Sequence, residues 1–293
     1  MKQVRRGTDS WKYLTTLLAA LALAAGAWAD EAAPVRAEAA EPAGGGGAAD
    51  NAQELAKKLS NPVASLISVP FQFNFDEGIG PNSRGSKFTL NLQPVIPISI
   101  SEDWNVIWRN IMPVIYQSHV IGNSNQGGLG DFTDSLFLSP KKLVGGIVIG
   151  VGPAFLLPTA TDDRLGSEKW AAGPTAVILK QSHGWTVGVL ANSLWSFAGN
   201  DDRDQVKSTF VQPFVVYTTK TVTTFSLNTE STYNWDAQSQ PWSIPVNFQV
   251  AQLMKFGKLP VQISGGPRYW AETPANGPSG WGFRFVVTFL FPK

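Results

Sequence analysis

Hydrophobic and polar residues alternate one by one through much of the chain from residue 64 onward. The clearest case is the C-terminal segment, where one face of an extended strand carries Trp281, Phe283, Phe285, Val287, Phe289 and Phe291. The same two-residue period occurs in 67–75, 88–100, 225–230 and 242–250. It is typical of β-strands with one apolar and one polar face. No apolar run in this region approaches the roughly 20 residues of a membrane helix, so in a membrane only a closed barrel remains.

The connections between the expected strands alternate in length. We expect strands at 64–75, 86–100, 104–116, 129–138, 143–157, 170–180, 185–198, 207–217, 221–233, 241–253, 260–270 and 281–291. Odd-numbered links are long and rich in Gly, Asn and Asp, whereas even-numbered links are mostly tight turns. Outer-membrane barrels have long loops outside and short turns on the periplasmic side. A soluble sandwich has no reason to alternate in this way. The sequence therefore predicts an all-β fold, a closed antiparallel transmembrane β-barrel of about twelve strands.

Composition supports this class and excludes others. The chain has 17 Phe and 11 Trp but only 15% charged residues, which suits large apolar surfaces with aromatic rims. It has no cysteine, which excludes disulfides, thiolate metal sites and a cysteine nucleophile. The formal net charge of +1 offers no basic field for nucleic acid.

The N-terminal part predicts export. Residues 1–29 combine a basic start, a short apolar run and Ala27-Trp28-Ala29 before Asp30, as in a signal peptide; an uncleaved anchor helix is the alternative. Residues 30–49 are expected to form a flexible linker and residues 50–61 a short periplasmic helix. This helix either packs on the rim or enters the lumen as a plug. The barrel is expected to occupy residues 62–293, and the protein to reside in the outer membrane of a Gram-negative bacterium.

Several short motifs carry a resemblance. They are Asn61-Pro62-Val63-Ala64, Gly128-Leu129-Gly130-Asp131, Leu157-Pro158-Thr159, Gln212-Pro213-Phe214, and Trp281-Gly282-Phe283-Arg284-Phe285 with Phe291-Pro292-Lys293. As a set they resemble outer-membrane barrels grouped with the phenol meta-pathway (MetA) family, whose relatives are often labelled "transporter" or "neuromedin U". The resemblance covers roughly residues 51–293 and implies a barrel with a transport role. The chain departs from usual barrels in placing Pro292-Lys293 after the terminal aromatic residue.

Catalytic and metal chemistry find little support. His119 lies in an expected long loop and His183 in a turn at the opposite end, so the two cannot form a dyad. A lipid hydrolase on a barrel of this size is the enzyme alternative. The loop acids Asp162, Asp163, Asp201, Asp202 and Asp204 match no EF-hand spacing and are expected to be solvated rather than to bind calcium. We expect no catalytic residue, no metal site, no cofactor and no enzymatic activity.

The lumen is where function is expected. If the apolar faces meet lipid, polar residues point inward, and we predict that the pore is lined by Arg109, Asp131, Glu230, Arg268 and Arg284. Three arginines against two acids favour anions; a salt-bridged network filling a narrow barrel is the alternative. The sequence thus predicts a channel or transporter for small solutes, and otherwise a plugged structural or binding barrel. Its expected partners are outer-membrane lipid, the barrel-assembly machinery and a small-molecule solute, with no nucleic acid.

Overall fold

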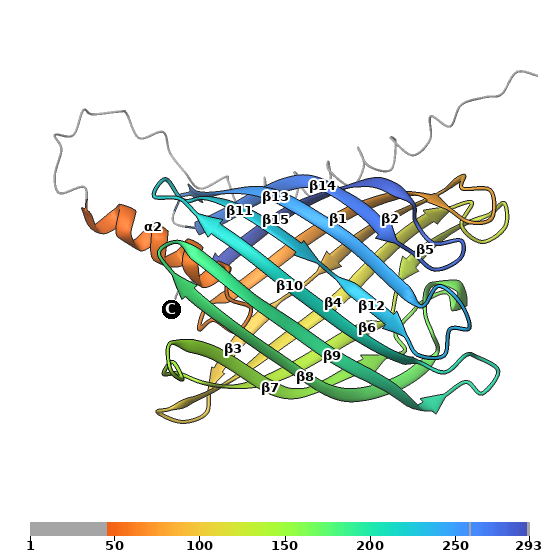
Figure 1. Ribbon diagram of the computed structural model, residues 1–293, viewed down its shortest axis with the longest axis horizontal. Helices are drawn as coiled ribbons and strands as arrows, with labels where there is room; N and C mark the ends of the chain where they lie inside the picture. Colours follow the sequence, from red (N-terminus) through yellow and green to blue (C-terminus); the bar gives the residue numbers. More distant parts are fainter. Residues whose placement is uncertain (1–45, 258, 292–293) are drawn as a thin grey trace, which may run out of the picture. The chain divides into compact units, whose positions relative to one another are not determined.

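The strands close into a single antiparallel barrel (Figure 1). The computed structural model describes residues 46–257 and 259–291, with side chains from residue 51 onward. The predicted signal peptide and most of the predicted linker lie outside the described residues. No helix in the described part of the chain is long and apolar enough to cross a membrane. The predicted fold class is confirmed.

The barrel wall has twelve strand positions, here called staves. Fifteen strands fill them, because three staves are each divided into two shorter strands. The strands are β1 (Ile67–Ile79), β2 (Gly85–Leu92), β3 (Val95–Ser99), β4 (Trp104–Ser118), β5 (Asn125–Leu129), β6 (Phe132–Pro140), β7 (Ile147–Leu157), β8 (Lys169–Ser182), β9 (Trp185–Gly199), β10 (Lys207–Thr218), β11 (Thr223–Thr229), β12 (Ser231–Asn234), β13 (Trp242–Phe256), β14 (Leu259–Glu272) and β15 (Gly280–Phe291). The divided staves are β2 with β3, β5 with β6, and β11 with β12. The short strands β3 and β12 were each predicted as part of a longer strand, whereas all of β5 except Leu129 was predicted as a loop.

Proline accounts for each interruption, since it lacks the N–H that a ladder needs. Pro94 separates β2 from β3 in its own stave. Pro113 lies opposite the break between β5 and β6 and accepts a hydrogen bond from the Gly130 amide at 2.9 Å. Pro245 lies opposite the break between β11 and β12, where its carbonyl accepts from the Glu230 amide at 3.3 Å.

The first and last strands close the barrel. They pair from Ile67 with Phe291 to Phe75 with Phe283, without a register shift. Closure removes the free sheet edges, which leaves no unpaired ladder facing lipid. The strand β1 runs on to Ile79, so the first long loop is confined to 80–84 and is shorter than the predicted 76–85.

Apolar and aromatic side chains cover the outside of the wall. Phe283 is 52% exposed and Phe285 37% exposed, whereas Arg284 between them is 1% exposed and points into the lumen. This is the predicted register of β15. Exposed tryptophans include Trp104 and Trp185, which begin their strands near one end, and Trp281, which begins β15 near the other. Such an exterior suits a hydrocarbon layer with aromatic residues near its borders.

One carboxylate breaks the apolar exterior. Asp134 lies opposite Asn110 on the outer face, in the middle part of β4 and β6. It accepts hydrogen bonds from Asn110 Nδ2 at 2.6 Å and from Trp108 Nε1 at 2.9 Å. These two donors reduce the cost of placing a polar group against hydrocarbon, because an acceptor without partners there loses its hydration.

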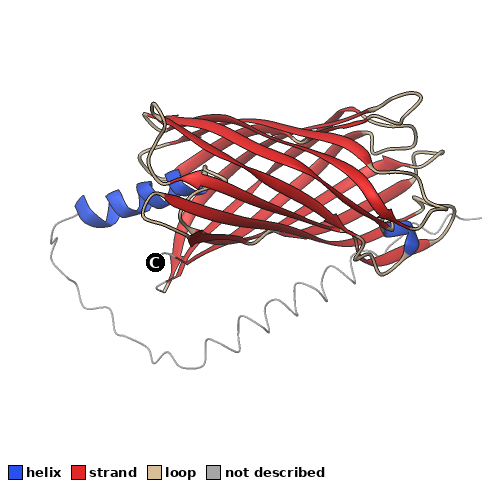
Figure 2. Ribbon diagram, turned by 90° about the horizontal axis from the view of Figure 1, so that it is seen from below, coloured by secondary structure: helices blue, strands red, loops and turns tan. Residues whose placement is uncertain are grey.

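The helix α2 (Gly46–Leu59) precedes the barrel and begins four residues before the predicted start at Asp50. Ala48 and Ala49 favour this extension because alanine has the highest helix propensity. Figures 1 and 2 show α2 at one end of the barrel, and Figure 2 shows the short helix η1 (Asp163–Leu165) at the other. Ala56 of α2 is fully buried in an apolar cluster with Ala64, Leu66, Leu253 and Leu290.

The segment that follows α2 fills the lumen at the same end. Val63 is 4% exposed and packs in an apolar core whose other buried members come from five different strands: Ile107, Phe137, Val177, Leu179, Leu190, Phe214 and Val216. These side chains alternate with outward-facing residues on their strands, so they converge inside the barrel. The two positions predicted for the helix, on the rim or inside the lumen, stay predictions; the buried residues Val63, Ala64 and Leu66 belong to the segment that follows it.

Candidate functional site in the barrel lumen

A bidentate ion pair lies at the centre of the lumen. Arg284 donates from Nη1 to Glu230 Oε1 and from Nη2 to Glu230 Oε2, each at 2.7 Å. Its Nε donates to Asn74 Oδ1 at 2.7 Å. The Arg284 side chain is 2% exposed and that of Glu230 is 21% exposed. The parallel geometry matches the planar guanidinium to the carboxylate and holds both side chains in place.

A second arginine joins this pair. Arg268 on β14 donates from Nη1 to Asn74 Oδ1 at 3.2 Å, and its Nε lies 3.1 Å from Asp76 Oδ1. Its Nη1 lies 3.7 Å from Glu230 Oε2. The guanidinium also stacks over the ring of Trp270, 4.6 Å from the centroid. The two arginines thus share Asn74 and Glu230, and the whole cluster acts as one electrostatic unit.

Glu230 continues the inward series of Ser226 and Asn228 and lies at a strand break. It lies between β11 and β12, with its amide bonded to the carbonyl of Pro245. Neighbouring Asn228 accepts a hydrogen bond from Asn247 Nδ2 at 3.0 Å, and Asn247 is fully buried. The acid therefore points inward beside a packed layer of amides.

The other two predicted pore residues make no direct contact with this cluster, although Arg109 lies near enough to act electrostatically on Glu230. Arg109 on β4 donates to Gln93 Oε1 at 3.1 Å and forms no ion pair with a carboxylate of the described residues. Asp131 lies towards the η1 end, where its carboxylate accepts from the amide of Ser167 at 2.6 Å and from that of Ala160 at 3.2 Å. Asp131 thus anchors the loop 158–168, and a role of these five residues in lining a pore stays a prediction.

Sequence reasoning missed two members of the charged layer. Asp76 was assigned to a loop, yet it continues the inward series of Gln72 and Asn74, and the Trp270 Nε1 donates to it at 2.7 Å. Lys87 lies opposite Asp76 on β2 and faces the same side of the wall. The two-residue period, extended by one step beyond Asn74, was the signal that would have found Asp76.

The charges in the layer do not balance. Arg109, Arg268, Arg284 and Lys87 contribute four positive groups, while Asp76 and Glu230 contribute two negative groups. Four positive groups against two negative groups leave an excess of positive charge in this part of the lumen.

The histidines offer no catalytic arrangement. His119 follows β4 at the η1 end and His183 follows β8 at the α2 end. Each contacts the hydroxyl of the preceding serine through Nδ1, at 2.8 Å for Ser118 and 2.7 Å for Ser182. Neither imidazole forms an ion pair with a carboxylate in the part of the chain that the structure describes.

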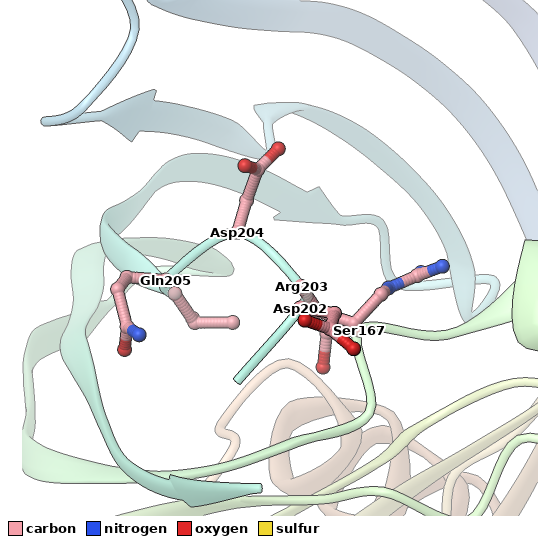
Figure 3. Close-up of a pocket in the computed structure, with 6 residues that line it drawn as sticks. Ser167, Asp202, Arg203, Asp204 and Gln205 are labelled. Carbon is pink, nitrogen blue, oxygen red and sulfur yellow. The ribbon is translucent and has the colours of Figure 1, made fainter. Parts of the chain in front are cut away.

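The loops 158–168 and 200–206 form a hollow at the η1 end. It has a volume of about 350 Å³ and is lined by Ser167, Asp202, Arg203, Asp204, Gln205 and Val206. Arg203 Nη2 donates to the carbonyls of Asp163 at 2.9 Å and Gly166 at 2.5 Å, which ties the two loops together. In Figure 3 the Asp204 side chain points away from Ser167. Among the described residues no group of acids and histidines is arranged to hold a metal ion.

Comparisons with known proteins point to the fold. No protein-family description and no curated protein matches the sequence. Among solved structures, the COG4313 outer membrane channel from Pseudomonas putida F1 superimposes with a TM-score of 0.59 at 18% identity, covering 77% of this chain and 94% of that one. The outer membrane phospholipase A from Escherichia coli gives a TM-score of 0.48 at 10% identity, covering 77% and 90%.

The fold is that of an outer-membrane β-barrel. Its closed twelve-stave wall, apolar exterior and buried polar interior agree with that assignment and with a location in the outer membrane. The comparisons support an outer-membrane barrel family without supporting the name of the phenol meta-pathway family.

Proposed function

We propose that the protein is an outer-membrane channel for small solutes, closed at its α2 end by its own N-terminal segment. The observation that carries this proposal is the position of Val63, which is 4% exposed inside the lumen. Val63 belongs to the segment before β1 and not to a strand of the barrel. Displacing the segment would remove Ala56, Val63, Ala64 and Leu66 from the apolar clusters and leave space within the wall.

The interior charges also support passage of solutes. A barrel of about twelve strands can be filled by side chains, and an apolar filling avoids the cost of desolvating ions. This chain instead carries an excess of positive groups in the lumen. The similarity to a solved outer membrane channel adds to this reading, and the motif set around residues 61–64 and 281–285 supports membership of the phenol meta-pathway family as part of the same proposal.

Conductance of the refolded protein in a planar bilayer tests the proposal. We expect the chain without residues 30–66 to conduct strongly and the full mature chain to conduct rarely. A matched deletion of residues 30–45 keeps α2 and Val63 and should behave as the full chain. Absence of conductance after the longer deletion, in a protein that still shows barrel mobility on gels, would indicate a structural or binding barrel.

A lipid-hydrolysis assay on the same sample tests the enzyme alternative. We propose that the protein is not an enzyme, because among the described residues each histidine side chain contacts the hydroxyl of its neighbouring serine and no carboxylate. Release of fatty acid that is lost in His119→Ala, and retained in His183→Ala, would contradict this reading and identify a hydrolase.

A further inference from the structure

A cavity of about 140 Å³ lies in the lumen between the N-terminal segment and the barrel wall. Its apolar lining includes Leu59, Pro62, Leu66 and Val95. Its polar lining includes Ser68, Gln93, Arg109, Gln262 and Thr288. The lining thus combines hydrocarbon with hydrogen-bonding groups, which is the usual composition of a site for a small organic molecule.

Arg109 is the charged group on the wall of this cavity. Among the described residues its side chain donates to Gln93 Oε1, a neutral acceptor, at 3.1 Å. Arg268 and Arg284, by contrast, each pair with Glu230. Arg109 interacts with Glu230 only through the longer-range electrostatic attraction. A guanidinium has five N–H donors in a planar fork, so Arg109 retains donors that fit a carboxylate.

The other cation on the lining, Lys58, is already paired. Its Nζ lies 2.7 Å from Glu54 Oε1, one turn earlier on α2, and its side chain is 41% exposed. Of the two positive groups at the cavity, Arg109 is therefore the one without a direct carboxylate partner among the described residues. Apart from Arg109, the surrounding layer has three positive groups and two negative groups, and this excess of one positive charge adds to the attraction for an anion.

We propose that this cavity binds a small organic monocarboxylate, with its carboxylate on Arg109 and its hydrocarbon part against Leu59, Pro62 and Leu66. The volume is close to that of an engineered cavity of about 150 Å³ that accepts benzene. The inference rests on the proposed channel function and names the class of solute. The bound anion contacts both the wall and the N-terminal segment, so the ligand is recognised where the lumen is closed.

A monocarboxylate fits better than a phosphate or a neutral molecule. One guanidinium compensates one negative charge, whereas a dianion would bring an uncompensated charge into an enclosed, partly apolar site. A neutral amide would use the hydrogen bonds without the charge assistance, which roughly doubles the strength of each bond.

Calorimetric titration of the full mature chain in detergent micelles with butanoate tests the proposal. We expect one site per chain. Arg109→Gln should weaken binding by about tenfold to a hundredfold, the range expected when a hydrogen-bonded charge partner is lost. Arg164→Gln removes an exposed arginine of the loop 158–168 and is the matched control, with unchanged affinity. Equal affinity of the Arg109 variant would overturn the assignment.

Other ligands test the proposed site on the unaltered protein, even if the Arg109→Gln variant does not fold. Butanamide should bind the unaltered protein at least tenfold more weakly than butanoate, and inorganic phosphate should not displace butanoate. Equal binding of the amide, displacement by phosphate, or no heat of binding would each overturn the proposal. The calorimetric test measures binding and not conductance. A protein that binds butanoate but never conducts would therefore contradict the proposed channel function and leave the proposed binding site standing.

Discussion

Replacing Arg284 by glutamine tests whether the lumen network holds the barrel together. The change removes two hydrogen bonds of 2.7 Å to Glu230 and one of 2.7 Å to Asn74. It leaves Glu230 charged inside the barrel, with its side chain 21% exposed and Arg268 Nη1 at 3.7 Å. Removing one partner of a buried ion pair usually costs about 3–5 kcal/mol.

The remaining contact with Arg268 and the partial exposure of Glu230 reduce this cost. We therefore expect the free energy of unfolding to fall by about 3 kcal/mol, the lower end of that range. The double variant Arg284→Gln with Glu230→Gln removes both charges and should recover roughly 2 kcal/mol of the loss, since directly contacting residues couple by about 0.5–3 kcal/mol.

Urea unfolding in liposomes, followed by the fluorescence of the nine tryptophans that follow the predicted signal peptide, measures both values. Arg84→Gln, at an exposed position in the loop 80–84, is the control and should leave the unfolding midpoint unchanged. A loss below about 1 kcal/mol in the single variant, or no recovery in the double variant, would refute the reasoning that the buried acid depends on Arg284.

Three further predictions concern the exterior and the loops. Phe285→Arg should lower the stability of the barrel in liposomes by about 2–4 kcal/mol, whereas Val286→Arg projects into the lumen and should be tolerated better; the reverse order would mean that the register is wrong. A protease site inserted in the loop 158–168 should be cleaved on intact cells and one in the turn 141–146 protected, and the opposite pattern would invert the topology. The neighbouring Arg164 lowers the pKa of Asp162 below its ordinary 3.8, so this contact stabilises the folded loop at neutral pH and the contribution is lost as the pH falls through the lowered pKa. Amide hydrogen exchange in the loop should then accelerate at acidic pH, and an exchange rate without this acceleration would contradict the prediction.

The wall was predictable because its sequence signal is strictly local. The alternation of Phe283, Arg284 and Phe285 fixes which face of β15 meets lipid, and a slip by one residue would expose the arginine. The same alternation correctly placed Arg268, Arg284 and Glu230 on inward faces, and the nearness of β14, β15 and β1 followed from barrel closure.

The filling of the lumen was not predictable in the same way. Val63 belongs to no periodic segment, and its partners Phe137 and Phe214 lie far along the chain, so no window of sequence reveals the core. The polar contact of Asp134 with Trp108 on the outer face is equally hidden, because a carboxylate at an outward position contradicts the pattern that identifies the strand. Such exceptions depend on neighbours supplied by another strand.

The interior position of Val63 constrains how the barrel is assembled. Its partners belong to β4, β6, β8, β9 and β10, so the core around it cannot exist until that part of the wall has curved. Val63 also precedes β1, which must meet β15 to close the ring. Contacts between residues so distant in sequence form slowly, because a long loop of chain must be ordered first. The N-terminal segment is therefore caught inside as the seam closes, or threads in afterwards through an end, and the sealing of the lumen is a late event in the biogenesis of the protein.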